Sequence, residues 1–218
     1  MSRILVVTNA SHDDATNYLE AWSRQITQSV QKQSNIRLLE LRGVDANRKS
    51  VEEVITKEHP QLVIFNGHGA SDAIFGHKHE ILIKQGENDS LLSKKIVHAL
   101  ACKSGQSLGP SCISIGGIAY IGYKENFKFI AQTSRDTEQT RLQDPYAPYF
   151  LNPAFSAIIA LVEGKSVGEA YKISQDQHAK NLLSLVSNVD DTYSKILAPQ
   201  VYHNLRHQVC LGDQEAAF

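Results

Sequence analysis

The chain has 218 residues, which is enough for one sizeable hydrophobic core and favours one domain over two. Its 22 Lys and Arg and 23 Asp and Glu leave a net charge of −1, so charge gives no basis for binding nucleic acid or an anionic membrane. The apolar run at residues 4–8 is too short for a signal peptide or a membrane span. Three cysteines are too few for a disulfide framework, so we expect a cytoplasmic protein with free thiols.

The first half of the chain alternates between apolar runs of strand length and segments with helical spacing. Three runs predict buried strands, over residues 4–8, 36–42 and 61–69. Ser11, Asp13 and Asp14 supply N-cap side chains for a helix after the first strand, and a second helix over 50–58 is predicted to begin at Ser50. This alternation favours a mainly parallel sheet with helices on both faces.

The middle of the chain continues the pattern after one interruption. Residues 72–89 have the pattern of a β-hairpin, with Gly86 and Asn88 as turn residues. A short helix and a fourth strand share residues 90–102, and Pro110 suits the first position of the helix that follows. A fifth strand is predicted at 118–123 and a sixth at 209–213, which gives a six-stranded sheet besides the hairpin.

The remaining segments are a polar stretch and three helices. Residues 132–148 have no apolar periodicity, and a loop of that length in a compact domain is usually functional or disordered. Two helices are predicted around 150–164 and over 166–186, and a third over 192–208 that Pro199 breaks.

Two consecutive strands of the predicted sheet end in reactive side chains. His68 lies between two glycines in "VIFNGHGA", and Cys102 ends "VHALACKSG". The separation of 34 residues (102 − 68) allows a crossover that places the two strands side by side and parallel. A thiol nucleophile and an imidazole base would then share one sheet edge. The backbone N–H groups of Gly69 and Cys102 could hold an oxyanion, and Gly105 allows a tight turn after the thiol.

Other chemistry is less well supported. His77 and His79 would face one way on a strand and could bind a metal with Cys102 or Glu80. No second paired cluster completes such a site, so we expect no metal and no cofactor. Three further candidates lie in apolar settings and are predicted to be core residues: His98, Cys112 and Cys210. A nucleotide pocket after the first strand stays open, although "NASHDD" lacks the glycines of a dinucleotide site.

At these residues the sequence resembles the caspase-like cysteine peptidases, which include caspases, metacaspases, legumain, clostripain, gingipains, separase and bacterial CHAT domains. The resemblance rests on "LVIFNGHG" and "IVHALACKSG", apolar blocks that end in His-Gly and Ala-Cys. It is closest to the CHAT, gingipain and clostripain side, which "IGGIAYIGY" and "CLGD" also resemble. It covers about residues 1–130 and the last few. The resemblance implies a three-layer α/β/α fold in one domain over 1–218, and a bacterial cysteine endopeptidase.

The resemblance also implies roles for individual residues. His68 matches the general base and acid, Cys102 the nucleophile, and the N–H groups of Gly69 and Cys102 the oxyanion donors. The substrate pocket is expected near two groups of residues: Asp13 and Asp14 after the first strand, and Ile121, Gly122 and Tyr123 in the fifth.

An aspartate in that pocket would favour Lys or Arg before the scissile bond. With such a preference, Arg135 or Arg141 would be a candidate autoprocessing site, and 132–148 a cleavable linker. Leu100 stands where caspases have glutamine, so a caspase-type preference for aspartate is not expected.

Two other functions stay open. The site could be silent and the chain a caspase-like scaffold or regulatory binding module, or the strand-end pocket could hold a nucleotide or effector with Cys102 incidental. The intact pair of His68 and Cys102 favours the peptidase. We therefore expect a protein or peptide substrate and a regulatory protein as partners, and neither nucleic acid nor a membrane.

Overall fold

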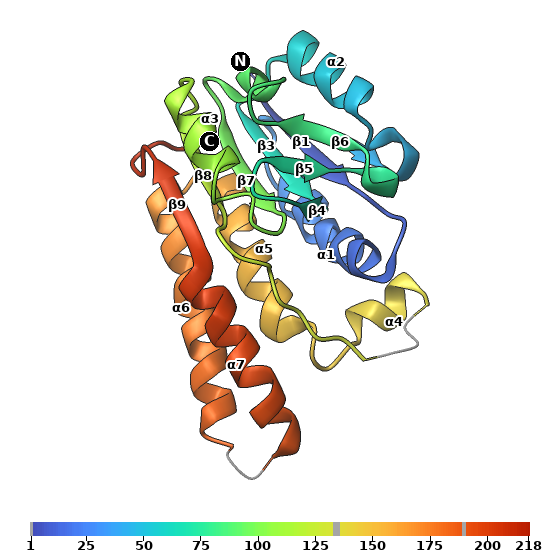
Figure 1. Ribbon diagram of the computed structural model, residues 1–218, viewed down its shortest axis with the longest axis vertical. Coiled ribbons are helices and arrows are strands. Elements are labelled where there is room, and N and C mark those ends of the chain that lie inside the picture. Colours follow the sequence, from blue (N-terminus) through green and yellow to red (C-terminus); the bar gives the residue numbers. More distant parts are fainter. Residues whose placement is uncertain (1, 133–135, 189–190) are drawn as a thin grey trace.

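A computed structural model describes residues 2–132, 136–188 and 191–218. At its centre lies a six-stranded sheet in the order β2-β1-β3-β7-β8-β9 (Figure 1). Neighbouring strands run parallel except for β9, which is antiparallel to β8. The six strands are β1 (Arg3–Asn9), β2 (Ile36–Arg42), β3 (Leu62–Asn66), β7 (Ile96–Leu100), β8 (Ala119–Tyr123) and β9 (Gln208–Gly212). The predicted six-stranded, mainly parallel sheet is confirmed.

Helices cover both faces of this sheet and produce three layers (Figure 1). Helices α1, α5 and α6 pack on one face, α2 and α3 lie on the other, α4 packs against α1, and α7 packs against α6. Their bounds are α1 (Asp14–Val30), α2 (Arg48–Glu58), α3 (Leu108–Ser114), α4 (Glu138–Leu142), α5 (Pro148–Val162), α6 (Val167–Val186) and α7 (Thr192–His207). None of the described helices has the length and apolarity that a membrane crossing needs.

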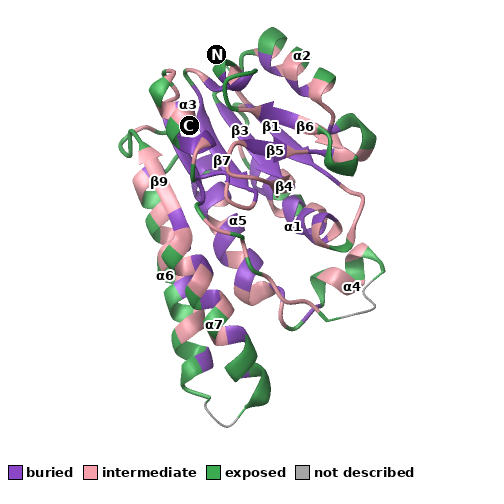
Figure 2. Ribbon diagram, in the orientation of Figure 1, coloured by how far each residue is buried: buried purple, intermediate pink, exposed green. Residues whose placement is uncertain are grey.

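Residues on the central strands alternate between the two apolar layers. Leu5 and Val7 pack towards α1 and α5, whereas Val6 and Val63 pack towards α2. Because both faces are covered, these strands have continuous apolar runs instead of apolar residues at every second position only. Figure 2 shows the result as a buried sheet between partly exposed helices.

The hairpin after β3 has its turn at a different place from the predicted one. Strand β5 (Ala73–Phe75) runs antiparallel to β6 (Ile81–Lys84), and the turn between them contains a 3₁₀ helix over His77–His79. Gly86 and Asn88 follow β6, where the Asn88 side chain accepts from the Lys84 N–H at 2.9 Å. The predicted hairpin is confirmed. The predicted position of its turn was wrong, because polar residues that favour turns follow β6 as well as β5.

Helix α2 begins earlier than predicted. Its N-cap is Asn47, whose Oδ1 accepts from the Ser50 N–H at 2.9 Å. Ser50 is therefore the third residue of the helix, and its assignment as the cap was wrong. Both side chains are good caps, and only the backbone geometry distinguishes them.

Helix α7 runs unbroken through Pro199, contrary to the prediction. Proline removes one hydrogen bond and crowds the carbonyl four residues earlier, which kinks a helix without having to end it. Leu197 and Val201, on either side of Pro199, are both buried, so packing holds the helix together at this point. Pro110 is likewise the third residue of α3 instead of its first.

The polar stretch 132–148 is not wholly a loop. It contains α4, with Thr137 as its N-cap. Its far end is anchored by Asp144, which accepts from the Tyr18 hydroxyl at 2.7 Å and from the N–H of Ala147 at 2.9 Å. A helix of five residues is too short to leave a periodic apolar pattern in the sequence.

Candidate active site

The two predicted catalytic residues lie beyond neighbouring strands of the sheet. Strands β3 and β7 pair in parallel, with Asn66 opposite Leu100. His68 follows β3 in the short strand β4 (His68–Gly69), and Cys102 follows β7 at the same edge. Both side chains line one pocket of about 240 Å³. The structure thus brings His68 and Cys102 together as the sequence predicts.

Glycines on both sides of His68 allow the two strand ends to approach. A Cβ atom on Gly69 would lie 2.5 Å from the carbonyl oxygen of Cys102, and one on Gly67 would lie 2.5 Å from that of Phe75. Both distances are impossible for real side chains. The "GHG" sequence is therefore required by close packing around the histidine.

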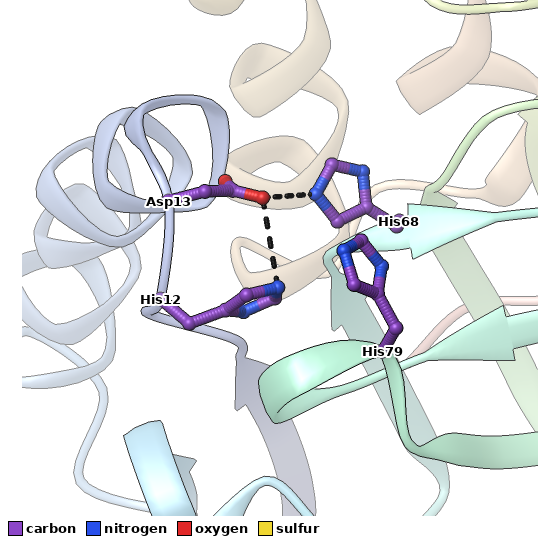
Figure 3. Close-up of side chains that lie close together, drawn as sticks. All are labelled: His12, Asp13, His68 and His79. Carbon is purple, nitrogen blue, oxygen red and sulfur yellow. Dashed lines mark hydrogen bonds and ion pairs between the residues drawn. The ribbon is translucent and has the colours of Figure 1, made fainter.

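Asp13 binds the histidine from the start of α1 (Figure 3). One carboxylate oxygen, Oδ1, accepts from the Thr16 N–H at 2.9 Å and caps the helix. The other oxygen, Oδ2, lies 2.6 Å from Nε2 of His68. Burial disfavours the carboxylate, but the hydrogen bonds from Thr16 and His68 outweigh burial and lower the pKa of Asp13 from 3.8 to about 2.

This hydrogen bond selects one tautomer of the imidazole. The ionised Asp13 can only accept, so Nε2 of His68 carries the proton and donates it. Nδ1 then keeps its lone pair, and it makes no hydrogen bond with any of the described residues. In its neutral form, His68 therefore offers Nδ1 as a proton acceptor, and Asp13 holds the ring.

Cys102 is a free, half-buried thiol. Burial raises the pKa of Cys102 above its ordinary 9.0, and a backbone hydrogen bond from Phe127 and the charges of Lys128 and Lys103 offset only part of that effect. The resting thiol is therefore protonated at neutral pH. It needs a base to become a nucleophile.

The turn after Cys102 holds the thiol at the sheet edge. Lys103 has a φ of 60°, in the left-handed region, and the Ser104 hydroxyl donates to the carbonyl of Ala101 at 3.0 Å. The N–H of Gly105 then donates to the carbonyl of Tyr123 at 2.9 Å and ties the turn to β8. This tight turn is the one expected from "CKSG".

The pocket beside the dyad has a mainly apolar wall that the sequence did not reveal. Besides His68 and Cys102, it is lined by Ala15, Thr16, Leu19, Gly67, Leu100, Phe127 and Phe129. Phe127 and Phe129 could have been noticed in the sequence, because they alternate with polar residues in "NFKFI", shortly after the fifth strand.

None of the residues expected to bind substrate lines the pocket, although Ala15 and Thr16, directly after Asp13 and Asp14, do. Ile121, Gly122 and Tyr123 are buried inside β8, where they cannot face an open pocket. Asp14 is exposed in the first turn of α1, and Asp13 is bonded to Thr16 and His68. The start of α1 thus reaches the pocket, whereas the side chains of β8 face the two core layers. Substrate binding by the expected residues stays a prediction.

Three histidines, His68 among them, lie around Asp13, on the side of the site away from β8. One ligand atom each from His12, Asp13, His68 and His79 lies within 4.8 Å of all the others. The sequence suggested a different grouping, with His77 and His79 on a strand. They lie instead in a 3₁₀ helix, and the Glu80 carboxylate accepts from the Arg48 N–H.

Two of the three predicted core residues, His98 and Cys112, are fully buried, and Cys210 is not. His98 is fully buried, and burial lowers its pKa to about 3, so it is neutral. Cys112 is also fully buried, and burial raises its pKa to about 12. Cys210 is only half-buried, on β9, which makes it a useful control thiol.

One candidate autoprocessing residue, Arg135, lies outside the described residues. The other, Arg141, is half-buried in α4, and its N–H donates to the carbonyl of Thr137. Cleavage there would require α4 to open, because a peptidase needs an extended substrate. Autoprocessing stays a prediction.

Comparison with solved structures reveals the fold. The chain superposes on the Arg specific cysteine proteinase gingipain R with a TM-score of 0.62, over 99% of this chain and 47% of that one, at 11% identity. The chain has a caspase-like fold. A complex of the Porphyromonas gingivalis RgpB pro- and mature domains matches similarly, with a TM-score of 0.61 and 11% identity over 98% of this chain and 47% of that one.

The chain thus spans about half the length of these caspase-like neighbours. No family model matches it, and no curated protein does either. At 11% identity the likeness shows the fold alone, so the function must be argued from the site.

Proposed function

We propose that this chain is a cysteine endopeptidase, with Cys102 as nucleophile, His68 as general base and acid, and Asp13 as the positioning residue. One observation carries the proposal: His68 and Cys102 line the same pocket at adjacent strand ends, and Asp13 bonds His68 through Nε2. The fold shared with a cysteine proteinase supports it.

The proposed reaction depends on the His68 tautomer that carries its proton on Nε2 and leaves Nδ1 free to accept one. Nδ1 of His68 takes the proton of the Cys102 thiol as the sulfur attacks the scissile carbonyl carbon. The N–H groups of Gly69 and Cys102 hold the resulting oxyanion. His68 returns the proton to the leaving amine, which breaks the peptide bond and leaves a thioester on Cys102. Water, deprotonated by His68, then hydrolyses the thioester and restores the thiol.

We further propose that the pocket takes an apolar side chain. Among its described lining residues none is acidic, and Leu19, Leu100, Phe127 and Phe129 supply most of its wall. A Lys or Arg side chain would find no carboxylate there to offset the loss of its hydration. The preference for Lys or Arg expected from the resemblance therefore has no support in the pocket, although one structural neighbour is Arg specific.

A positional-scanning peptide library tests activity and preference together. We expect wild type to cleave after Leu, Phe or similar residues, Cys102→Ala to lose activity, and Cys210→Ala to retain it. Turnover confined to Lys or Arg would contradict the apolar pocket. Activity that persists in Cys102→Ala would rule out the mechanism.

Covalent labelling separates the peptidase from a silent scaffold. A leucyl chloromethyl ketone peptide should label Cys102 faster than its lysyl counterpart, and His68→Ala should slow the labelling on the order of 10²-fold, the usual contribution of a general base. Labelling that is equally fast without His68 would favour a binding module with an incidental thiol.

A further inference from the structure

We propose that His12, Asp13, His68 and His79 form a site for a divalent transition-metal ion such as Zn²⁺, and that the bound ion switches the peptidase off. The metal-binding site is argued from its geometry alone and does not depend on the proposed peptidase function. The inhibitory role rests on the function proposed above, because it acts by occupying the general base.

The four side chains are already close to a coordination geometry. Oδ2 of Asp13 lies 2.6 Å from Nε2 of His68 and 3.5 Å from Nε2 of His12, and all four ligand atoms lie within 4.8 Å of one another. Ligand atoms around a tetrahedral zinc ion stand about 3.4 Å apart, given bonds of about 2.1 Å. Side-chain rotations that bring these atoms to that spacing would complete the shell.

A second observation points to a missing ligand. The side chain of His12 is only 9% exposed, and neither of its ring nitrogens has a hydrogen-bond partner among the described residues. The contact of Nε2 with Oδ2 of Asp13, at 3.5 Å, is too long for a good hydrogen bond, and a buried polar group without a hydrogen bond is costly. The His12 ring meets those of His68 and His79 at centroid distances of 5.7 and 4.9 Å, and one of its nitrogens is among the clustered ligand atoms (Figure 3).

The types of ligand atom in the cluster indicate which metal ions it would bind. Three imidazole nitrogens and one carboxylate oxygen suit Zn²⁺ and related transition metals, whereas Mg²⁺ and Ca²⁺ prefer oxygen ligands. His79 is exposed, which leaves the cluster open to ions from solvent. The ligands come from three separate segments, the loop before α1, strand β4 and the 3₁₀ helix after β5, so only the folded chain assembles them.

A bound ion would disable His68 through its tautomer. When Nε2 gives its lone pair to a metal, the neutral imidazole carries its proton on Nδ1. Nδ1 then has no lone pair to accept the thiol proton, and the Asp13 carboxylate is turned from His68 to the ion. The resting thiol is protonated, so Cys102 would lose its only route to a thiolate.

Cobalt binding to Cys102→Ala tests the site without the thiol. We expect one Co²⁺ ion per chain, with the visible absorption of a four-coordinate site, and displacement by Zn²⁺. His79→Asn should weaken binding at least tenfold. His59→Asn is the matched control, because both histidines are exposed and have left-handed backbones, with φ of 62° at His79 and 49° at His59.

Two results of this experiment would overturn the site. One is the absence of binding at roughly 100 µM Co²⁺, about a hundredfold above the micromolar range that such a ligand set should reach. The other is binding that His79→Asn leaves unchanged. If the first result is accompanied by a thiolate-to-cobalt band in wild type, the metal binds the Cys102 thiol instead.

Inhibition is measured on the active chain. Zn²⁺ should inhibit peptide cleavage reversibly, with recovery on adding EDTA, and half-inhibition should need at least tenfold more zinc in His79→Asn than in His59→Asn, each relative to its own metal-free rate. An active enzyme that zinc does not inhibit overturns the switch. A chain that binds cobalt but cleaves nothing overturns the proposed function and the inhibitory role, and establishes the site alone.

Discussion

At the scale of single residues, Asp13 uses its two oxygens for different tasks. Oδ1 caps α1 and Oδ2 holds His68, so the start of a helix orients the imidazole. The cap could be predicted from the sequence, because it involves a residue three positions away. The bond to His68 could not, since it joins segments 55 residues apart.

The Asp13→Asn variant tests that second task. Asparagine caps helices as well as aspartate does, so the fold should persist, but an amide does not enforce the Nε2–H tautomer of His68. We expect kcat/KM to fall on the order of 10²-fold or more, within the range that general acid–base catalysis contributes. Unchanged kcat/KM in purified, folded Asp13→Asn would remove Asp13 from the mechanism.

Asp13 should also contribute to stability in a defined pH window. Its folded pKa is depressed to about 2 from 3.8, so its stabilising effect is present above pH 4 and is lost as the pH falls towards 2. The difference in Tm between wild type and Asp13→Asn should therefore shrink over that interval. A difference that stays constant from pH 5 to pH 2 would contradict the depressed pKa.

The resting state of Cys102 can be measured by alkylation. Because burial raises the pKa of this thiol above 9.0, its reaction with iodoacetamide should accelerate with rising pH beyond 9. Cys210→Ala prevents reaction at the other half-buried thiol. A rate that instead reaches a plateau near pH 6 would indicate a preformed thiolate and imidazolium pair.

At the scale of elements, the sequence located nearly every helix and strand but erred at their ends. Asn47 and Ser50 illustrate the reason: both are good caps, and the choice depends on where the chain leaves the 3₁₀ turn over Gly43–Asp45. Pro199 shows the same limit, since burial on both sides keeps α7 intact. Local sequence preference indicates where a helix could begin or end, but tertiary packing determines where it does.

The cap of α2 gives a direct test. Asn47→Ala should lower the free energy of unfolding by about 1 kcal/mol, the usual value of an N-cap. Ser50→Ala should change it by less than about 0.5 kcal/mol, because only the backbone N–H of Ser50 takes part in the cap. Urea denaturation of the two variants decides between them, and the reverse order would restore Ser50 as the cap.

At the scale of the whole molecule, the order of elements was predictable and the walls of the site were not. Strands β3 and β7 bring His68 and Cys102 together because consecutive parallel strands share an edge. Phe127, Phe129 and His12 reach that edge from loops, and His79 reaches it from a short 3₁₀ helix in the hairpin turn. Loop positions depend on packing across the whole chain, which no local pattern encodes.

The C-terminal segment is part of the core. Phe218 is 5% exposed, and its ring lies under the guanidinium of Arg3 at 4.9 Å. We expect Phe218→Ala to cost about 3 kcal/mol in the free energy of unfolding. Tyr193→Ala, at a side chain that is 54% exposed, serves as the control and should cost far less. Equal losses in urea denaturation would contradict the buried role of Phe218.

The contact between Arg3 and Phe218 has a practical consequence. It brings both ends of the described chain together (Figure 1), beside the start of β1. The dyad lies past the opposite ends of β3 and β7. A tether, tag or fused domain joined at either end would leave the molecule on the far side from the pocket. Immobilisation through either end of the described chain should therefore leave the pocket turned to the solution.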